Sequence, residues 1–61
     1  MALQTRRNDP VVYADAIRSI ALEELDGQDT QRRSQWLANR VGVSYDAVRI
    51  EVDQMVELLA H

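Results

Sequence analysis

The sequence has no cysteine and no lysine, and its 61 residues include one histidine, one proline and two glycines. Without cysteine, no disulfide can stabilise the fold, and the lone histidine, His61, cannot build a metal site by itself. There is no Gly-rich phosphate loop, and the serines have no neighbouring base that would activate a nucleophile. We therefore expect no enzyme, no metal, no cofactor and no small-molecule ligand.

Long hydrophobic runs are lacking too. No apolar stretch approaches the roughly 18 residues of a membrane span, and the N-terminal residues contain no apolar core of a signal peptide. A chain of 61 residues forms one domain at most, and a domain of that size buries only about 60% of its unfolded surface. We expect a cytoplasmic protein without membrane contact, whose stability comes from helix packing or from association.

Positive charge is scarce, because the net charge is −3 and all seven basic residues are arginines. An acidic chain opposes non-specific binding to nucleic acid, so any DNA-binding function depends on how the charge is distributed. Residues 28–49 carry four arginines against two aspartates, whereas residues 50–61 carry three acids and no arginine. A lysine-free acidic composition suits a GC-rich genome or a high-salt cytoplasm, and both interpretations stay open.

The residue pattern along the sequence predicts a flexible arm over residues 1–8 and a single domain over residues 9–61. Asp9 and Pro10 form a strong helix start, since aspartate accepts the free N–H groups and proline loses nothing at the first helical position. Apolar residues then recur every three or four positions to Leu25, which predicts an amphipathic helix over residues 10–25. Gly27 can adopt the left-handed conformation that stops this helix.

Two further helices are predicted. The second covers residues 31–41, is capped by Asp29 or Thr30, and ends at Gly42. The third covers residues 45–60 and is capped by Ser44. No strand is expected, because hairpin dipeptides and alternating runs are missing.

Three amphipathic helices with short loops predict an all-α three-helix bundle. The residues expected on the apolar face of the first helix are Val12, Tyr13, Ala16, Ile17, Ile20, Ala21 and Leu25. Those expected on the second are Trp36, Leu37 and Val41, and those on the third are Val48, Val52, Met55 and Leu59, with Val56 beside them. Four apolar residues lie off these stripes: Val11 and Leu22, which can widen the stripe of the first helix, and Ile50 and Leu58, which are expected to be more exposed.

The second and third helices carry the residue pattern of a helix-turn-helix. Ala38 provides a small side chain where the helices cross, Gly42 provides the turn, and Val48 follows six residues later. This stretch of about 20 residues resembles the helix-turn-helix superfamily of phage repressors and many bacterial regulators. Residues 37–49 also resemble the helical half of winged-helix regulators of the GntR and MarR type. The sequence ends at His61 before a β-hairpin wing, so that resemblance covers the helical half only.

The resemblance implies a DNA-binding transcriptional regulator whose third helix enters the major groove of double-stranded DNA by its N-terminal half. In this hypothesis Arg49 contacts a guanine, Asp46 accepts from a cytosine amino group, and Tyr45 contacts a phosphate or a thymine methyl. The complete set of expected DNA-contacting residues is Arg32, Arg33, Arg40, Ser44, Tyr45, Asp46 and Arg49. The three arginines of the second helix are expected to contact phosphates.

One short module makes few DNA contacts, so we expect a homodimer. Apolar residues outside the core are the basis of that expectation: Val11, Leu22, Val56, Leu58 and Leu59. The alternative is a small acidic protein-interaction module that binds a regulator or a polymerase and does not contact DNA. The simpler interpretation of Arg32 and Arg33 is pairing with Asp29 or with glutamates of the first helix, and that of Arg49 is an ordinary surface arginine.

Overall fold

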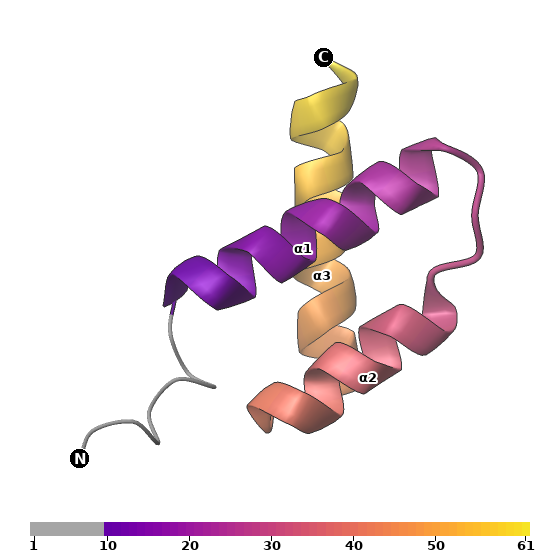
Figure 1. The fold of residues 1–61 in the computed structure, drawn as a ribbon. Helices are drawn as coiled ribbons and strands as arrows, with labels where there is room; N and C mark the ends of the chain where they lie inside the picture. Colours follow the sequence, from indigo (N-terminus) through magenta and orange to yellow (C-terminus); the bar gives the residue numbers. More distant parts are fainter. Residues whose placement is uncertain (1–9) are drawn as a thin grey trace.

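The computed structural model describes residues 10–61, and these form three helices (Figure 1). Helix α1 spans Pro10–Leu25, α2 spans Gln31–Val41 and α3 spans Tyr45–Ala60. All three pairs of helices are in contact, and α1 and α2 cross the same side of α3. The predicted all-α three-helix bundle is confirmed, and the expected helix bounds agree with the structure. The predicted arm over residues 1–8 and the Asp9 cap lie outside the described residues.

Two glycines end the first two helices, as their positions predict. Gly27 has φ +88° and Gly42 has φ +86°, a conformation that glycine adopts without steric cost. After α1, the Gln28 amide donates to the Glu23 carbonyl at 3.1 Å and the Gly27 amide donates to the Glu24 carbonyl at 3.0 Å. These two bonds satisfy carbonyls that the helix end would otherwise leave without a partner.

The starts of α2 and α3 use different capping residues. Thr30 occupies the position before α2, but its side chain makes no capping hydrogen bond. The Asp29 carboxylate instead accepts from the Gln31 amide at 3.0 Å. Ser44 caps α3 as predicted, since its hydroxyl oxygen accepts from the Ala47 amide at 3.1 Å. The three-residue turn 42–44 thus joins the end of α2 directly to the capped start of α3.

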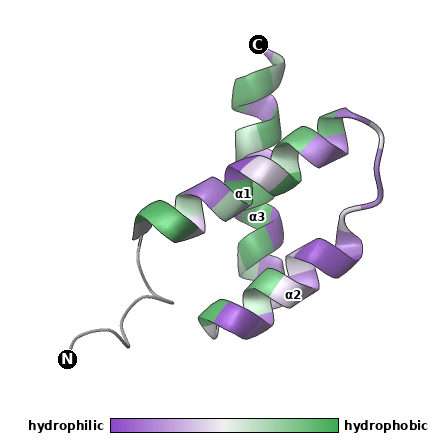
Figure 2. Ribbon diagram, viewed as in Figure 1, coloured by the Kyte–Doolittle hydropathy of each residue, from purple (hydrophilic) through white to green (hydrophobic). Residues whose placement is uncertain are grey.

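The core is small and lies where the helices cross. Its fully buried hydrophobic residues are Ile17, Ile20, Ala21, Leu37, Ala38, Val48 and Val52. Ala38 is 1% exposed, which agrees with the predicted need for a small side chain at the α2–α3 crossing. Figure 2 shows that α2 is the most hydrophilic of the three helices, so it contributes only one short buried stripe. Within the described residues, none of the helices is long and apolar enough to cross a membrane.

Three of the residues expected on the apolar faces are exposed and neither belong to the core nor pack against it. Val12 is 53% exposed, Leu25 is 46% exposed and Trp36 is 51% exposed. A 16-residue helix is roughly 24 Å long, and because α1 crosses α3 instead of lying along it, only the middle of α1 is covered (Figure 1). Val12 and Leu25 lie in its first and last turns. Ile50 and Leu58 are exposed as predicted, whereas Val11 and Leu22 are exposed and do not widen the buried stripe of α1.

Candidate nucleic-acid interface

The first turns of α2 and α3 meet at one end of the molecule and form an open surface there. Gln31, Arg32 and Gln35 of α2 line a shallow pocket together with Asp29 and with Tyr45 of α3. Arg32 is exposed and makes no ion pair within the described part of the chain. Four donors of the kind that contact phosphate therefore lie close together: a guanidinium, two amides and a phenol.

The open surface is flanked by a second pocket that contains the guanidinium of Arg49. The residues lining this second pocket are Glu24, Gln28, Asp29, Thr30, Gln31, Tyr45 and Arg49. The predicted contact residues Arg32, Tyr45 and Arg49 thus lie around the N-terminal ends of α2 and α3. Ser44 also lies at this end of α3, where its hydroxyl caps the helix.

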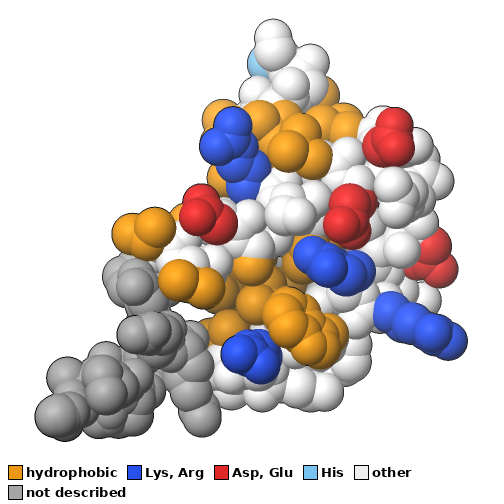
Figure 3. All heavy atoms as spheres, in the orientation of Figure 1, with side chains coloured by type: hydrophobic (Ala, Val, Ile, Leu, Met, Phe, Trp, Pro, Cys, Tyr) orange, Lys and Arg blue, Asp and Glu red, His pale blue; other side chains and the backbone are white. Residues whose placement is uncertain are grey.

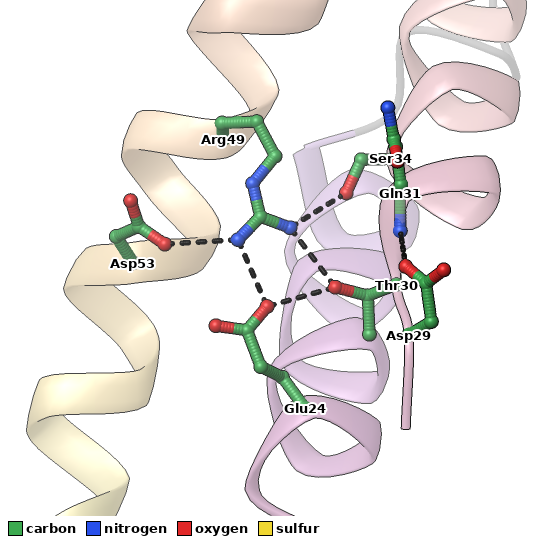
Figure 4. Close-up of polar contacts among 7 residues, drawn as sticks. All are labelled: Glu24, Asp29, Thr30, Gln31, Ser34, Arg49 and Asp53. Atoms are coloured by element: carbon green, nitrogen blue, oxygen red, sulfur yellow. Dashed lines mark hydrogen bonds and ion pairs between the residues drawn. The ribbon is translucent and has the colours of Figure 1, made fainter. Parts of the chain in front are cut away.

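Arg49 is held by contacts to all three helices and to the loop before α2 (Figure 4). Its Nη1 donates to the Thr30 and Ser34 hydroxyls, each at 3.0 Å. Its Nη2 donates to the Glu24 carboxylate at 2.8 Å and to the Asp53 carboxylate at 3.0 Å. The Arg49 side chain is 22% exposed. A bidentate contact to a guanine would compete with these hydrogen bonds for the same N–H groups, so Arg49 has a structural role in this fold.

The Arg49 cluster, which we define as Glu24, Thr30, Ser34, Arg49 and Asp53, is satisfied internally. The Thr30 hydroxyl both accepts from Arg49 and donates to Glu24 at 2.8 Å. Ser34 is fully buried, and no buried side-chain polar atom of the described residues lacks a hydrogen-bond partner. The cluster therefore connects the end of α1, the start of α2 and the middle of α3.

Hydrogen bonding within the cluster also shifts two ionisation equilibria. The bonds from Arg49 and then from Thr30 lower the pKa of the Glu24 carboxyl, because they stabilise its charged form. The bond to Glu24 raises the pKa of the Arg49 guanidinium for the same reason. Both shifts favour a persistent ion pair at neutral pH.

Arg33 and Arg40, also expected to contact phosphate, lie around Trp36 instead of beside Tyr45. Their guanidinium carbons are 5.8 Å and 5.6 Å from the centre of the indole ring, which is within the range of a cation–π contact. Arg33 additionally forms an ion pair with Glu23 at 3.7 Å. This agrees with the simpler interpretation of Arg33, whereas Arg32 forms no such pair.

The side of α3 that points away from α1 and α2 is acidic. Val48 and Val52 mark the buried side, and at about 100° per residue Asp46, Ile50 and Glu57 fall on the opposite side. All three are exposed, and so is Asp53. Arg49 is the single arginine of α3, so this open side carries no cation to contact phosphate. Asp46 lies in the first turn, where its charge favours the helix N-terminus.

The comparisons with known proteins give no relative. No protein-family model matches the chain, and neither a curated protein nor a solved structure gives a significant match. Functional inference therefore depends on the geometry and charge described above.

The sequence reasoning found the helix ends and missed the polar cluster. It treated Thr30 only as a possible cap and gave Glu24 and Ser34 no role. A usable indication was present: Ser34, Leu37 and Ala38 fall at helical spacing on one face of α2, so a serine occupies a core position. A buried hydroxyl has to find a hydrogen-bond partner, and Arg49 is the nearby donor that supplies it.

Proposed function

We propose that this chain binds double-stranded DNA through α2, the 42–44 turn and α3, and acts as a transcriptional regulator. The observation that supports this proposal is the packing of that unit. Ala38 and Val48 are buried at the crossing, Gly42 has a positive φ, and Ser44 caps α3. These are the positions at which a helix-turn-helix needs those residue types.

The contact surface of the proposal is the open end formed by α2 and α3. Arg32 supplies the phosphate contact, and the N-terminus of α2 adds the positive end of its helix dipole. Tyr45 and Ser44 lie at the start of α3, which is the part of a recognition helix that contacts base edges. The Asp29 carboxylate caps α2 at the same end and partly offsets this positive potential.

Two features limit the proposed interface to a few residues. Arg49 is engaged by its cluster, so we omit it from the residues that contact bases. Asp53 and Glu57 are exposed on α3, and their charges repel phosphates from its second half. Binding of one copy is therefore weak, and a specific site requires two copies, as in a homodimer bound to two half-sites.

A salt titration of DNA affinity tests the proposal. Binding of a labelled mixed-sequence duplex is measured by fluorescence anisotropy between 50 and 200 mM salt for the wild type, Arg32→Ala and Arg18→Ala. Arg18 is the matched control, because it is an exposed arginine of α1 without an ion pair within the described residues. Each phosphate contact contributes about −0.9 to the slope of log affinity against log salt. We expect Arg32→Ala to lose about that much slope and Arg18→Ala to lose none.

The second candidate function is a protein-interaction module without DNA contact. The observation that favours it is the acidic open side of α3, which carries Asp46, Ile50 and Glu57 and has no unengaged arginine. The same titration separates the two candidates. If the wild type does not bind the duplex even at 50 mM salt, the DNA proposal is lost and the interaction module is favoured.

A further inference from the structure

A half-exposed tryptophan lies between two arginines on the side of α2 that faces α1. Trp36 is 51% exposed. The guanidinium carbons of Arg33 and Arg40 lie 5.8 Å and 5.6 Å from the centre of its ring. Their seven-residue separation corresponds to two helical turns, or about 10.5 Å along the axis. The guanidinium groups are thus held at a set spacing on either side of an apolar surface, which lowers the ordering cost of binding a ligand there.

The facing edge of α1 carries Glu23 together with small and apolar side chains. The Arg33–Glu23 ion pair, 3.7 Å long, identifies Glu23 as lying on that edge. Residues four, seven and eleven positions before Glu23 share its helix face, and these are Ser19, Ala16 and Val12. Figure 3 shows hydrophobic side chains gathered in a hollow between the two helices, with basic side chains beside them.

This surface adjoins the proposed DNA interface at Arg32. At about 100° per residue, Trp36 is turned by about 140° around α2 from Gln31, which lines the pocket beside Tyr45. Arg32 is turned from Trp36 by only about 40°, so a molecule bound to Trp36 borders Arg32, whereas Gln31 and Tyr45 remain accessible. The inference below does not depend on DNA binding.

We propose that the Trp36 surface, defined as Arg33, Trp36, Arg40 and the facing edge of α1, binds an acidic helical segment of a partner protein. Charge complementarity supports this occupant, because α2 has three arginines and no acid in a chain of net charge −3. A helix lying along α2 meets the two guanidinium groups with carboxylates seven residues apart. An apolar side chain three or four residues after the first carboxylate then contacts the indole ring.

The existing ion pair does not prevent this binding. Arg33 and Glu23 are 45% and 30% exposed at their side chains, and surface pairs of this kind contribute little to stability. A partner carboxylate can therefore replace Glu23 at Arg33. Arg40 makes no ion pair within the described residues, so its charge is available.

Binding of a synthetic helical peptide tests the proposal. The probe is a fluorescein-labelled peptide with glutamates at positions i and i+7 and leucines at i+3 and i+4, measured by anisotropy at 50 mM salt. The matched control peptide has glutamine in place of both glutamates. The variants are Trp36→Ala, Arg33→Gln/Arg40→Gln and the control Arg18→Gln, which removes one exposed charge from a side of α1 that is turned away from Glu23. Circular dichroism checks that each variant folds.

We expect the wild type to bind the acidic peptide and the glutamine peptide to bind at least about tenfold more weakly, as the loss of two ion pairs predicts. Trp36→Ala should weaken binding about thirtyfold, the loss typical of a central aromatic contact. Arg33→Gln/Arg40→Gln should weaken it about tenfold, and Arg18→Gln should change it less than twofold.

Three outcomes would overturn the proposal. The first is no binding of the acidic peptide at 50 mM salt. The second is an equal loss of binding in Arg18→Gln and in Arg33→Gln/Arg40→Gln, which would indicate attraction by overall charge. The third is tighter, Trp36-dependent binding of a single-stranded oligonucleotide, which would assign the surface to base stacking. None of these outcomes bears on duplex binding by Arg32, so the two proposals fail independently.

Discussion

Replacing Arg49 by methionine tests the structural role of the Arg49 cluster. Methionine keeps the apolar stem of the side chain and removes all four hydrogen bonds to Thr30, Ser34, Glu24 and Asp53. The fully buried Ser34 hydroxyl then loses a donor, and Glu24 loses its ion-pair partner. The Asp53 carboxylate, whose side chain is 64% exposed, returns to water at little cost.

The expected loss of stability follows from these differences. Hydrogen bonds to charged groups contribute roughly 1.5–3 kcal/mol each when well shielded. The Arg49 and Glu24 side chains are 22% and 31% exposed, so solvent weakens their bond. We therefore expect a total loss of about 2 kcal/mol, with the i,i+4 pair to Asp53 contributing less than about 0.5 kcal/mol. A domain of this size has a free energy of unfolding of roughly 3–9 kcal/mol, so the loss is large.

Thermal and urea unfolding, followed by circular dichroism at pH 7, measure this effect. A loss of about 2 kcal/mol should lower Tm by about 8–16 °C. Arg32→Met is the matched control, and it should stay within about 0.5 kcal/mol of the wild type, as an exposed surface substitution does. If Arg49→Met also stays within that margin, the cluster contributes no stability, and Arg49 would again be a candidate for DNA contact.

Further predictions concern the turn, the loss of folding stability at low pH and the exposed tryptophan. Gly42→Val should destabilise by about 1–3 kcal/mol through backbone strain alone, because φ is +86° while the space around its Cα is open; an unchanged Tm would contradict the turn assignment. The lowered pKa of Glu24 means that its ionised form stabilises the fold above the ordinary value of 4.5, and this contribution is lost as pH falls through the lowered folded-state pKa. Urea titrations between pH 7 and pH 3 should thus show a smaller acid loss in Glu24→Gln than in the wild type, and equal losses would argue against the shift. Trp36→Ala should cost less than about 1 kcal/mol, since Trp36 is 51% exposed, whereas Leu37→Ala, at 4% exposed, should cost about 2–3 kcal/mol; similar losses in chemical denaturation would refute this contrast.

Helix bounds were predictable because local chemistry determines them. Gly27 and Gly42 stop helices through a backbone conformation that glycine adopts at no cost, and Ser44 caps α3 with its own side chain. Trp36 shows where the same reasoning fails. Periodicity gives the apolar side of a helix, but the angle at which helices cross decides which part of that side is covered.

The candidate site was less predictable, because its residues come together only in the folded chain. Arg49 is separated from Glu24 by 25 positions, and nothing local to either residue indicates their pairing. Arg33 and Arg40 belong to the same helix as Arg32, yet in the folded chain it is their guanidinium groups that approach the Trp36 ring. A count of arginines along the chain cannot separate these two groups.

The most direct test of DNA binding by this fold is an NMR titration of the ¹⁵N-labelled chain with a mixed-sequence duplex at 50 mM salt. The proposed function predicts that shifted amide signals cluster at the first turns of α2 and α3, around Arg32 and Tyr45. Signals from Gln54 to Leu58 should not move, because that part of α3 carries Glu57 and lies outside the interface. Shifts confined to that segment, or no shifts at all, would contradict DNA binding through α2 and α3.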